Sequence, residues 1–318
     1  MPDKIASIGR GLVGRAWAIA FARAGYNVSL VGREGVAADE MWAAINANLS
    51  DLEFFGEIVS AQEVRQRISE TYDLAEALDQ SVIAIESYPE NRDIKHDLFV
   101  EMDRLASADC ILCSSASGIS ASEFTEDIKG RQRCIITHPC NPPSFLRVVE
   151  IAPAPWTAPE VVERCRELME GIGKSTVIVK KEIMGFILNR LHIALVVEGL
   201  RLVDQGYVSG EDLEKVVKDG IGPRWAFMGP FETLDLNAPN GWREVMGYFG
   251  ELMKRMYPDR KWGDDVIKQI NEHLRNDLPS NSLDERRAWR DRQLMALDIL
   301  KNKSYVDWEE INVTNHNK

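Results

Sequence analysis

The chain has 318 residues, of which 45% are hydrophobic and 28% are charged, and its formal net charge is −12 at pH 7. The length suffices for two domains with separate cores, and the composition is that of an ordinary globular protein. The acidic balance, with no cluster of Lys and Arg, argues against nucleic acid as a partner, and no apolar run approaches the ~18 residues of a membrane span.

The N-terminus and the cysteines favour the cytoplasm as the cellular compartment. The sequence MPDKIASIG enters a predicted strand at once, so we expect no signal peptide and a cytoplasmic protein. The five cysteines are dispersed, and Cys110 and Cys113 lie in an apolar strand without the second pair that a zinc site would need. We therefore expect reduced thiols and no bound metal.

Up to about residue 185, short β-branched runs alternate with helical patterns. The predicted strands are 4–9, 27–31, 81–86, 109–115, 133–138 and 175–180. Helical patterns lie between them, as at 12–24 and 159–171, and the long segment 36–70 is expected to form a helix pair. This alternation predicts an α/β fold, a Rossmann-type doubly wound parallel sheet over residues 1–185. The strands are nearly all apolar, as in sheets that helices cover on both faces.

Beyond Gly185 the strand signal stops. Leucines recur at helical spacing within 186–206, and Ser209–Asp212 resembles a capping box that starts another helix. Three further segments are helical by pattern: 241–257, 262–276 and 283–302. The sequence thus predicts an all-α C-terminal domain over residues 186–318.

A glycine-rich turn follows the first predicted strand. Gly9, Gly11 and Gly14 spell GxGxxG, with Leu12 and Val13 in between, at the start of a predicted helix. The first glycine permits a tight turn, the second lets the backbone approach a pyrophosphate, and the third lets helix and strand pack closely. N–H groups at the helix start face the anion. This context predicts dinucleotide binding.

The end of the second strand reads NVSLVGREG. An Asp or Glu usually stands there to bind the ribose 2′-hydroxyl of the cofactor, but this chain has Gly32 followed by Arg33. Loss of the acid makes room for a 2′-phosphate, and an arginine supplies it with a charged partner. We therefore expect NADP in preference to NAD. Two alternatives stay open: Glu34 as the ribose ligand, and Arg33 as a solvated surface charge.

A histidine ends the fifth predicted strand. His138 opens the segment HPCNPPSFLRVVE, in which Glu150 follows after a Pro-rich turn that can fold it back. Ligands of open α/β sheets bind at the carboxyl ends of the strands. A histidine held by a carboxylate there fits proton transfer to and from a secondary alcohol.

These motifs resemble the 3-hydroxyacyl-CoA dehydrogenase superfamily. HPCNPPSFLRVVE is similar to its HxxNP…E motif, and three other segments carry the same resemblance: ESYPEN (86–91), SSASG (114–118) and GFILNR (185–190). GIGPRWAFMGPFETLDLNA (220–238) and RRAWRD (286–291) are closest to the lambda-crystallin and L-gulonate 3-dehydrogenase branch, with L-carnitine dehydrogenases a similar sister group.

The resemblance implies catalytic roles. His138 would be the general base and Glu150 its orienting partner, and Ser117 and Asn189 would contact the reacting oxygen of the substrate. A structural alternative stays open for each of the last two: Ser117 as a cap of the following turn, and Asn189 as a helix residue bonded to nearby backbone.

The resemblance also places charged residues near the ligands. Glu86, Glu90 and Lys95 match a family motif near the nicotinamide, where they would bind the cofactor or order its site. Arg224 stands beside Trp225 where hydroxyacyl-CoA enzymes usually lack an arginine. It would hold a substrate carboxylate, which favours a small 3-hydroxy acid over a CoA thioester, unless it forms an interdomain or intersubunit ion pair.

We therefore expect an NAD(P)-dependent dehydrogenase that oxidises the 3-hydroxyl of a small, L-gulonate-like hydroxy acid. The alternatives are a 3-hydroxyacyl-CoA or carnitine dehydrogenase, and a crystallin-like binding or structural protein without turnover. The apolar stripes of the helical domain exceed what one small sheet domain can cover, so we also expect a homodimer formed through that domain.

Overall fold

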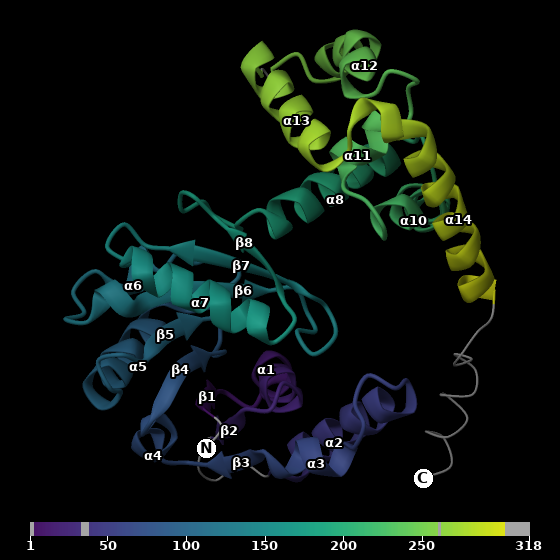
Figure 1. The fold of residues 1–318 in the computed structure, drawn as a ribbon. Helices are drawn as coiled ribbons and strands as arrows, with labels where there is room; N and C mark the ends of the chain where they lie inside the picture. The colour runs from purple at the N-terminus through teal and green to yellow at the C-terminus, as the bar shows by residue number, and fades with distance from the viewer. Residues whose placement is uncertain (1–2, 33–37, 260–261, 303–318) are drawn as a thin grey trace. The chain divides into compact units, whose positions relative to one another are not determined.

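The computed structural model describes residues 3–32, 38–259 and 262–302 of the chain (Figure 1). The chain forms two compact units, Met1–Val197 and Glu198–Lys318. The division lies within the long helix α8 (Leu188–Asp204), whereas the change in sequence pattern falls at its start.

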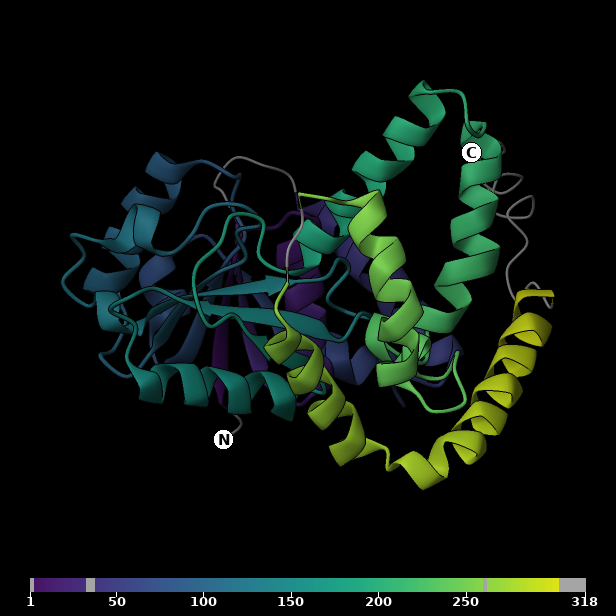
Figure 2. The same ribbon diagram turned by 90° about the horizontal axis from the view of Figure 1, so that it is seen from above.

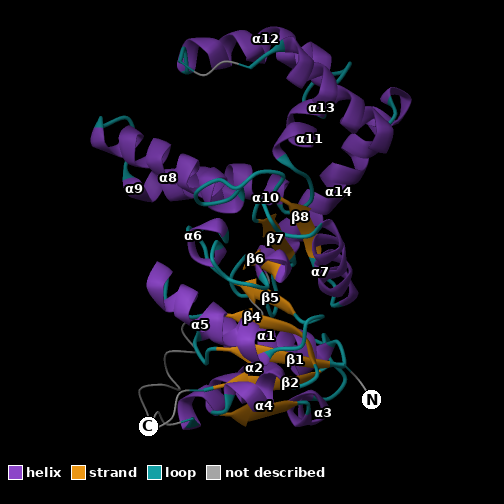
Figure 3. Ribbon diagram, turned by 90° about the vertical axis from the view of Figure 1, so that its left-hand side faces the viewer, coloured by secondary structure: helices purple, strands orange, loops and turns teal. Residues whose placement is uncertain are grey.

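The first unit contains an eight-stranded sheet. Its strands are β1 (Lys4–Ile8), β2 (Asn27–Val31), β3 (Ile68–Thr71), β4 (Ser81–Glu86), β5 (Ile111–Ser114), β6 (Cys134–Pro139), β7 (Val148–Pro153) and β8 (Ser175–Ile178). They lie in the order β3-β2-β1-β4-β5-β6-β7-β8. The order from β2 to β8 can be followed in Figure 3, and β3 is labelled in Figure 1. The Rossmann-type fold predicted from the sequence is confirmed.

The sheet departs from the prediction in two places. All six predicted strands are present, but β3 and β7 were not expected. The parallel arrangement expected for the whole sheet holds from β3 to β6, whereas β7 pairs with β6 antiparallel and β8 pairs with β7 in parallel. β3 is four residues long and three of the four are polar, and β7 lies directly after the Pro-rich turn, so neither has a strong strand pattern.

Helices cover both faces of the sheet. They are α1 (Leu12–Arg23), α2 (Asp39–Phe54), α3 (Ala61–Gln66), α4 (Leu74–Leu78), α5 (Arg92–Leu105), α6 (Ser122–Thr125) and α7 (Pro159–Gly171). One apolar cluster joins the sheet to α1, α2 and α7, and a second joins its other face to α4, α5 and α6. The helix pair expected within 36–70 is present as α2 and α3.

The described part of the second unit is helical, as expected, and its last element is the long helix α14, yellow in Figure 2. It contains the end of α8, α9 (Gly210–Lys215), a π-helix (Val216–Ile221), α10 (Gly222–Trp225), α11 (Pro230–Asp235), α12 (Trp242–Met256), α13 (Asp264–Asp277) and α14 (Leu283–Asn302). The predicted helix start is confirmed: Ser209 is the N-cap of α9, and its hydroxyl accepts a hydrogen bond from the Asp212 N–H (3.0 Å).

Candidate active site

His138 and Glu150 face each other across the β6–β7 pair. The antiparallel register places the two residues directly opposite, and Nδ1 of His138 lies 2.8 Å from Oε2 of Glu150. Both are buried, with 4% and 1% of their surfaces exposed. A buried carboxylate bonded to Nδ1 fixes that nitrogen as the protonated one and leaves Nε2 as the proton acceptor.

The second carboxylate oxygen of Glu150 binds the start of α8. Oε1 accepts hydrogen bonds from the N–H groups of Ile187 (2.7 Å) and Leu188 (3.0 Å). Burial raises the pKa of Glu150, but the hydrogen bonds from His138 and from these two N–H groups outweigh it, so the net pKa lies below its usual value. Glu150 is therefore a carboxylate at neutral pH.

A strained turn brings α8 to this pair. Gly185 and Phe186 both have positive φ angles, 76° and 47°, and such a value is rare for a bulky residue like Phe186. The fully buried Phe186 ring lies 5.3 Å from the His138 ring, measured between centroids. The turn thus packs the His138 ring and aims the Ile187 and Leu188 N–H groups at Glu150.

Ser117 and Asn189 are neighbours in the structure. The Asn189 side-chain amide donates to the Ser117 carbonyl (3.0 Å), which ties α8 to the loop after β5. Glu90 holds this loop from the other side, because its Oε1 accepts N–H groups from Ser117, Gly118 and Ile119 at 2.8–3.1 Å. The exposed Ser117 hydroxyl makes no hydrogen bond to any described residue, so it does not cap the turn.

Glu86 and Lys95 form a buried ion pair at the end of β4. The Lys95 ammonium lies 2.8 Å from Oε1 of Glu86, and the two side chains are 1% and 0% exposed. Ser114 on β5 also donates to Glu86. This geometry orders the strand ends around the Ser117 loop, while direct cofactor contact by Glu86, Glu90 or Lys95 stays a prediction.

The turn before α1 fits a dinucleotide. Gly9 has φ +114°, and a Cβ on Gly14 would lie 1.9 Å from the Gly9 carbonyl oxygen, so neither position tolerates a side chain. A Cβ on Gly11 would meet nothing within 4 Å, which leaves open space beside the helix start. Gly11 is the N-cap of α1 and offers no side-chain oxygen, and the first turn of α1, which includes Leu12 and Val13, has no acidic residue. A pyrophosphate fits these free N–H groups.

At the end of β2, Arg33 and Glu34 lie outside the described residues. Gly32 is described, and its N–H donates to the Thr71 carbonyl at the end of β3 (2.9 Å). The side chain of Arg10, from the glycine-rich turn, packs against Gly32. The position that normally carries an acid is therefore covered by an arginine of another segment.

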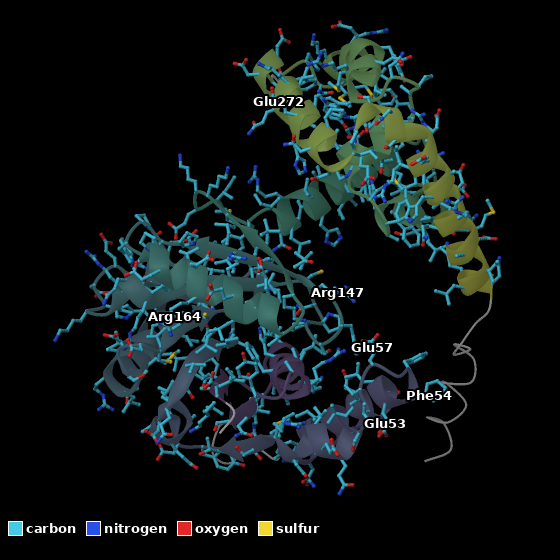
Figure 4. The ribbon with its side chains drawn as sticks, viewed as in Figure 1. Glu53, Phe54, Glu57, Arg147, Arg164 and Glu272 are labelled. Carbon is cyan, nitrogen blue, oxygen red and sulfur yellow. The ribbon has the colours of Figure 1, made fainter. Side chains whose placement is uncertain are left out.

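Two cations hold the loop between β6 and β7. The buried Lys174 ammonium donates to the carbonyls of Pro143 and Leu146, and Arg23 donates to the Ser144 carbonyl (3.0 Å). Burial, together with repulsion from Arg23 and Arg147, lowers the pKa of Lys174 to about 8. Arg23 also pairs with Glu57, which Figure 4 labels beyond α2 (2.8 Å). These contacts fix the Pro-rich loop that folds Glu150 back onto His138.

Arg224 lies in α10 of the second unit, where it is exposed. No ion pair of Arg224 occurs within the described part of the chain, so its predicted roles, as a substrate ligand or as an interface residue, both remain predictions. The two branch-specific segments do meet in this unit. Arg286 pairs with Glu232 (2.7 Å) and stacks on the Trp289 ring at 3.7 Å.

Sequence reasoning missed several residues that shape the site. The support of Glu150 by the α8 start depends on a backbone turn at Phe186, which no side-chain pattern reveals. Arg10 pairs with Glu70, but Glu70 lies on β3, a strand that was not predicted. The placement of Arg10 between two glycines was the available signal.

Fold and site together define a nicotinamide-dependent oxidoreductase that acts on CH–OH groups. Residues 4–183 match the NAD-binding domain of 3-hydroxyacyl-CoA dehydrogenase, and residues 185–285 match its C-terminal domain. The chain belongs to the 3-hydroxyacyl-CoA dehydrogenase family.

Similar proteins extend over most of the chain. The lambda-crystallin homolog of Bos taurus is 37% identical over 95% of this chain and 97% of its own. An L-carnitine dehydrogenase of a Pseudomonas species is 30% identical over 92% of each. The solved structure of 5-formyl-3-hydroxy-2-methylpyridine 4-carboxylic acid 5-dehydrogenase, described as an NAD+-dependent dismutase, superposes with TM-score 0.72 at 26% identity, over 95% of this chain and 99% of that one.

The described residues contain neither a membrane-spanning helix nor a cluster of metal ligands. No helix among them has the length and apolar character to span a membrane. Nor do three or more His, Cys, Asp or Glu side chains gather there in a way that could hold a metal ion.

Proposed function

We propose that the protein is an NAD(P)-dependent dehydrogenase that oxidises the 3-hydroxyl of a small, L-gulonate-like hydroxy acid, with His138 as the general base. The observation that carries this proposal is the buried His138–Glu150 pair at the end of β6, on the domain that carries the dinucleotide turn. The bound nicotinamide would accept the hydride that leaves the carbon of the alcohol.

Residues of the chain itself can take up the proton that the substrate hydroxyl loses. Glu150 keeps the proton of His138 on Nδ1, so that Nε2 takes the proton of the substrate hydroxyl, and the carboxylate stabilises the imidazolium that results. The Ser117 hydroxyl and the Asn189 amide can donate to the oxygen as charge develops on it. The bond from Asn189 to the Ser117 carbonyl keeps the two side chains together.

Arg224 supports the choice of a carboxylate substrate. It is exposed and has no carboxylate partner among the described residues, so its guanidinium is available for bidentate binding of an acid. The similarity to L-carnitine dehydrogenases also supports a small hydroxy acid, because L-carnitine is a 3-hydroxy acid. The absence of an acid at Gly32, next to Arg33, supports NADP in preference to NAD.

The exposed helix α8 supports a homodimer. Of its 17 residues only Gly199 is buried, and its exposed apolar residues include Ile193, Val197 and Leu200, the last 65% exposed. We propose that a second copy covers this stripe in an obligate interface of more than about 2,000 Å². Leu200→Glu should give a monomer in light scattering at micromolar concentration, with the exposed control Glu211→Gln still dimeric. A monomeric wild type would remove the proposal.

We also propose a cytoplasmic location, which the five free cysteines support. Cell fractionation with a marker of each compartment tests this proposal.

The experiment that tests the function is a panel of substrates with both cofactors. It contains 3-hydroxy acids including L-gulonate, L-carnitine, and 3-hydroxybutyryl-CoA, each with NAD+ and with NADP+. We expect the highest kcat/KM for L-gulonate or a similar 3-hydroxy acid other than carnitine, with NADP+. Preference for the thioester or for carnitine would reassign the substrate, and absence of turnover with any of them would indicate a crystallin-like role.

A further inference from the structure

Arg10 is an arginine inside the phosphate turn, between Gly9 and Gly11. Its side chain bends across the neighbouring strand ends, where its guanidinium forms an ion pair with Glu70 of β3. The two side chains are only 9% and 14% exposed. The Arg10 guanidinium carbon also lies 5.6 Å from the centroid of the Tyr72 ring. Arg10 is thus held in one place by residues that are remote in the sequence.

That place is directly over Gly32. A Cβ on Gly32 would lie 2.9 Å from Nε of Arg10 and 3.0 Å from its Cδ and Cζ. The first contact is shorter than real Cβ atoms show, so a side chain at residue 32 would require the flexible end of the Arg10 side chain to shift. In the observed structure, Arg10 therefore takes up the space beside the position that usually carries an acid.

This arrangement reverses the charge of a recognition position. In dinucleotide-binding sheets, an acid at the end of the second strand accepts a hydrogen bond from the ribose 2′-hydroxyl. Here a guanidinium covers that position. A guanidinium has only donors, which suit the oxygens of a phosphate in bidentate geometry better than a neutral hydroxyl.

We infer that Arg10 reads the ribose 2′ position of the cofactor and selects a 2′-phosphate, with Glu70 as the counter-ion that positions Arg10 until the phosphate binds. The inference rests on the proposed dehydrogenase function, which requires a nicotinamide dinucleotide. Glu70 has two effects in this arrangement: it orders the guanidinium, and its negative charge opposes the phosphate. In this inference, selectivity is set by residues of the turn and of β3.

The test measures nucleotide binding, independent of turnover. Isothermal titration of the full chain compares 2′,5′-ADP, which carries the 2′-phosphate, with 5′-ADP, which lacks it. Arg10→Met should raise the Kd for 2′,5′-ADP by about ten- to a hundredfold and the Kd for 5′-ADP by less than about threefold, because only 2′,5′-ADP loses a charge-assisted bond. Glu70→Gln should lower the Kd for 2′,5′-ADP and leave the Kd for 5′-ADP unchanged.

Two further variants serve as controls. Arg10→Lys keeps the charge without the planar fork and should retain part of the selectivity, so a folding defect of Arg10→Met cannot mimic the result. Arg67→Met, just before β3 at the opposite end of that strand, should bind both nucleotides as wild type does.

Three outcomes would overturn the inference. In the first, Arg10→Met weakens the binding of both nucleotides equally, which would make Arg10 a structural part of the turn. In the second, Arg10→Met has no effect and Arg33→Met abolishes the selectivity. In the third, wild type binds neither nucleotide. If it also fails to bind NADH and NADPH, the proposed function falls as well; if it binds them, the inference alone falls.

Discussion

The two units of this protein differ in how much core they have. In the first, two large apolar clusters cover both faces of the sheet, and His138, Glu150, Glu86 and Lys95 are buried among satisfied partners. In the described part of the second, the apolar cluster contains three buried residues: Met228, Leu236 and Leu283. Ion pairs such as Arg286–Glu232 and Arg275–Asp235 join its helices instead.

The difference indicates a division of labour. Burial in the first unit holds ionisable groups in fixed geometry, as proton transfer requires. The described part of the second unit has little core of its own. Its Arg224 and its Leu200, at the end of α8, are exposed, as expected of residues that meet a ligand or a partner. The first unit would then set the rate of the chemistry, and the second the substrate affinity.

The largest effect should come from the buried base of the first unit. His138→Gln should lower kcat by about 10²–10⁴-fold, because it removes the group proposed to take the hydroxyl proton, with NADPH binding nearly intact. The exposed His273→Gln is the matched control and should keep wild-type turnover. Near-normal turnover of the His138 variant would contradict its assignment as the base.

Removal of the partner carboxylate should lower kcat less than removal of His138. Glu150→Gln keeps the size of the side chain but loses the charge that orients His138, so we expect kcat to fall by about 10- to 100-fold. Steady-state kinetics beside the His138 variant gives the ranking. A Glu150 variant more impaired than His138→Gln would mean that Glu150 acts on the substrate directly.

In the second unit, the expected effect is on substrate affinity. Arg224→Met should raise KM for a 3-hydroxy acid by about ten- to a hundredfold, since a charge-assisted pair contributes ~1.5–3 kcal/mol. KM for the methyl ester of the same acid should change little, and Arg243→Met on α12 serves as the control. Equal losses for acid and ester would assign Arg224 to the structure.

The smallest effect concerns stability at low pH. Because the folded protein lowers the pKa of Glu150, its carboxylate contributes stability above the unfolded pKa, near 4.5, and this contribution is lost as pH falls through the lower folded value. Between pH 5 and 3 the Tm of wild type should therefore fall by a few degrees more than that of Glu150→Gln. Parallel Tm curves in differential scanning calorimetry would show that the group has no such role.

The sequence predicted the features that depend on local patterns. Six strands, the helix pair and the long helices follow from hydrophobic periodicity, and the spacing of His138 and Glu150 predicted a pair that the antiparallel β6–β7 register brings together. The pattern was too short to predict β3, and Glu70 was missed with it. The hydrogen bonds from α8 to Glu150 depend on the backbone at Phe186, whose positive φ no residue type indicates.

The most direct test of the account follows the hydride. A 3-hydroxy acid that carries deuterium on the carbon of its hydroxyl group is incubated with the wild-type protein and NADP+, and the reduced cofactor is analysed by mass spectrometry. The account predicts deuterium in the reduced cofactor with wild type and almost none within the same time with His138→Gln. Deuterium transfer at equal rates by both proteins, or no reduced cofactor with any 3-hydroxy acid, would contradict it.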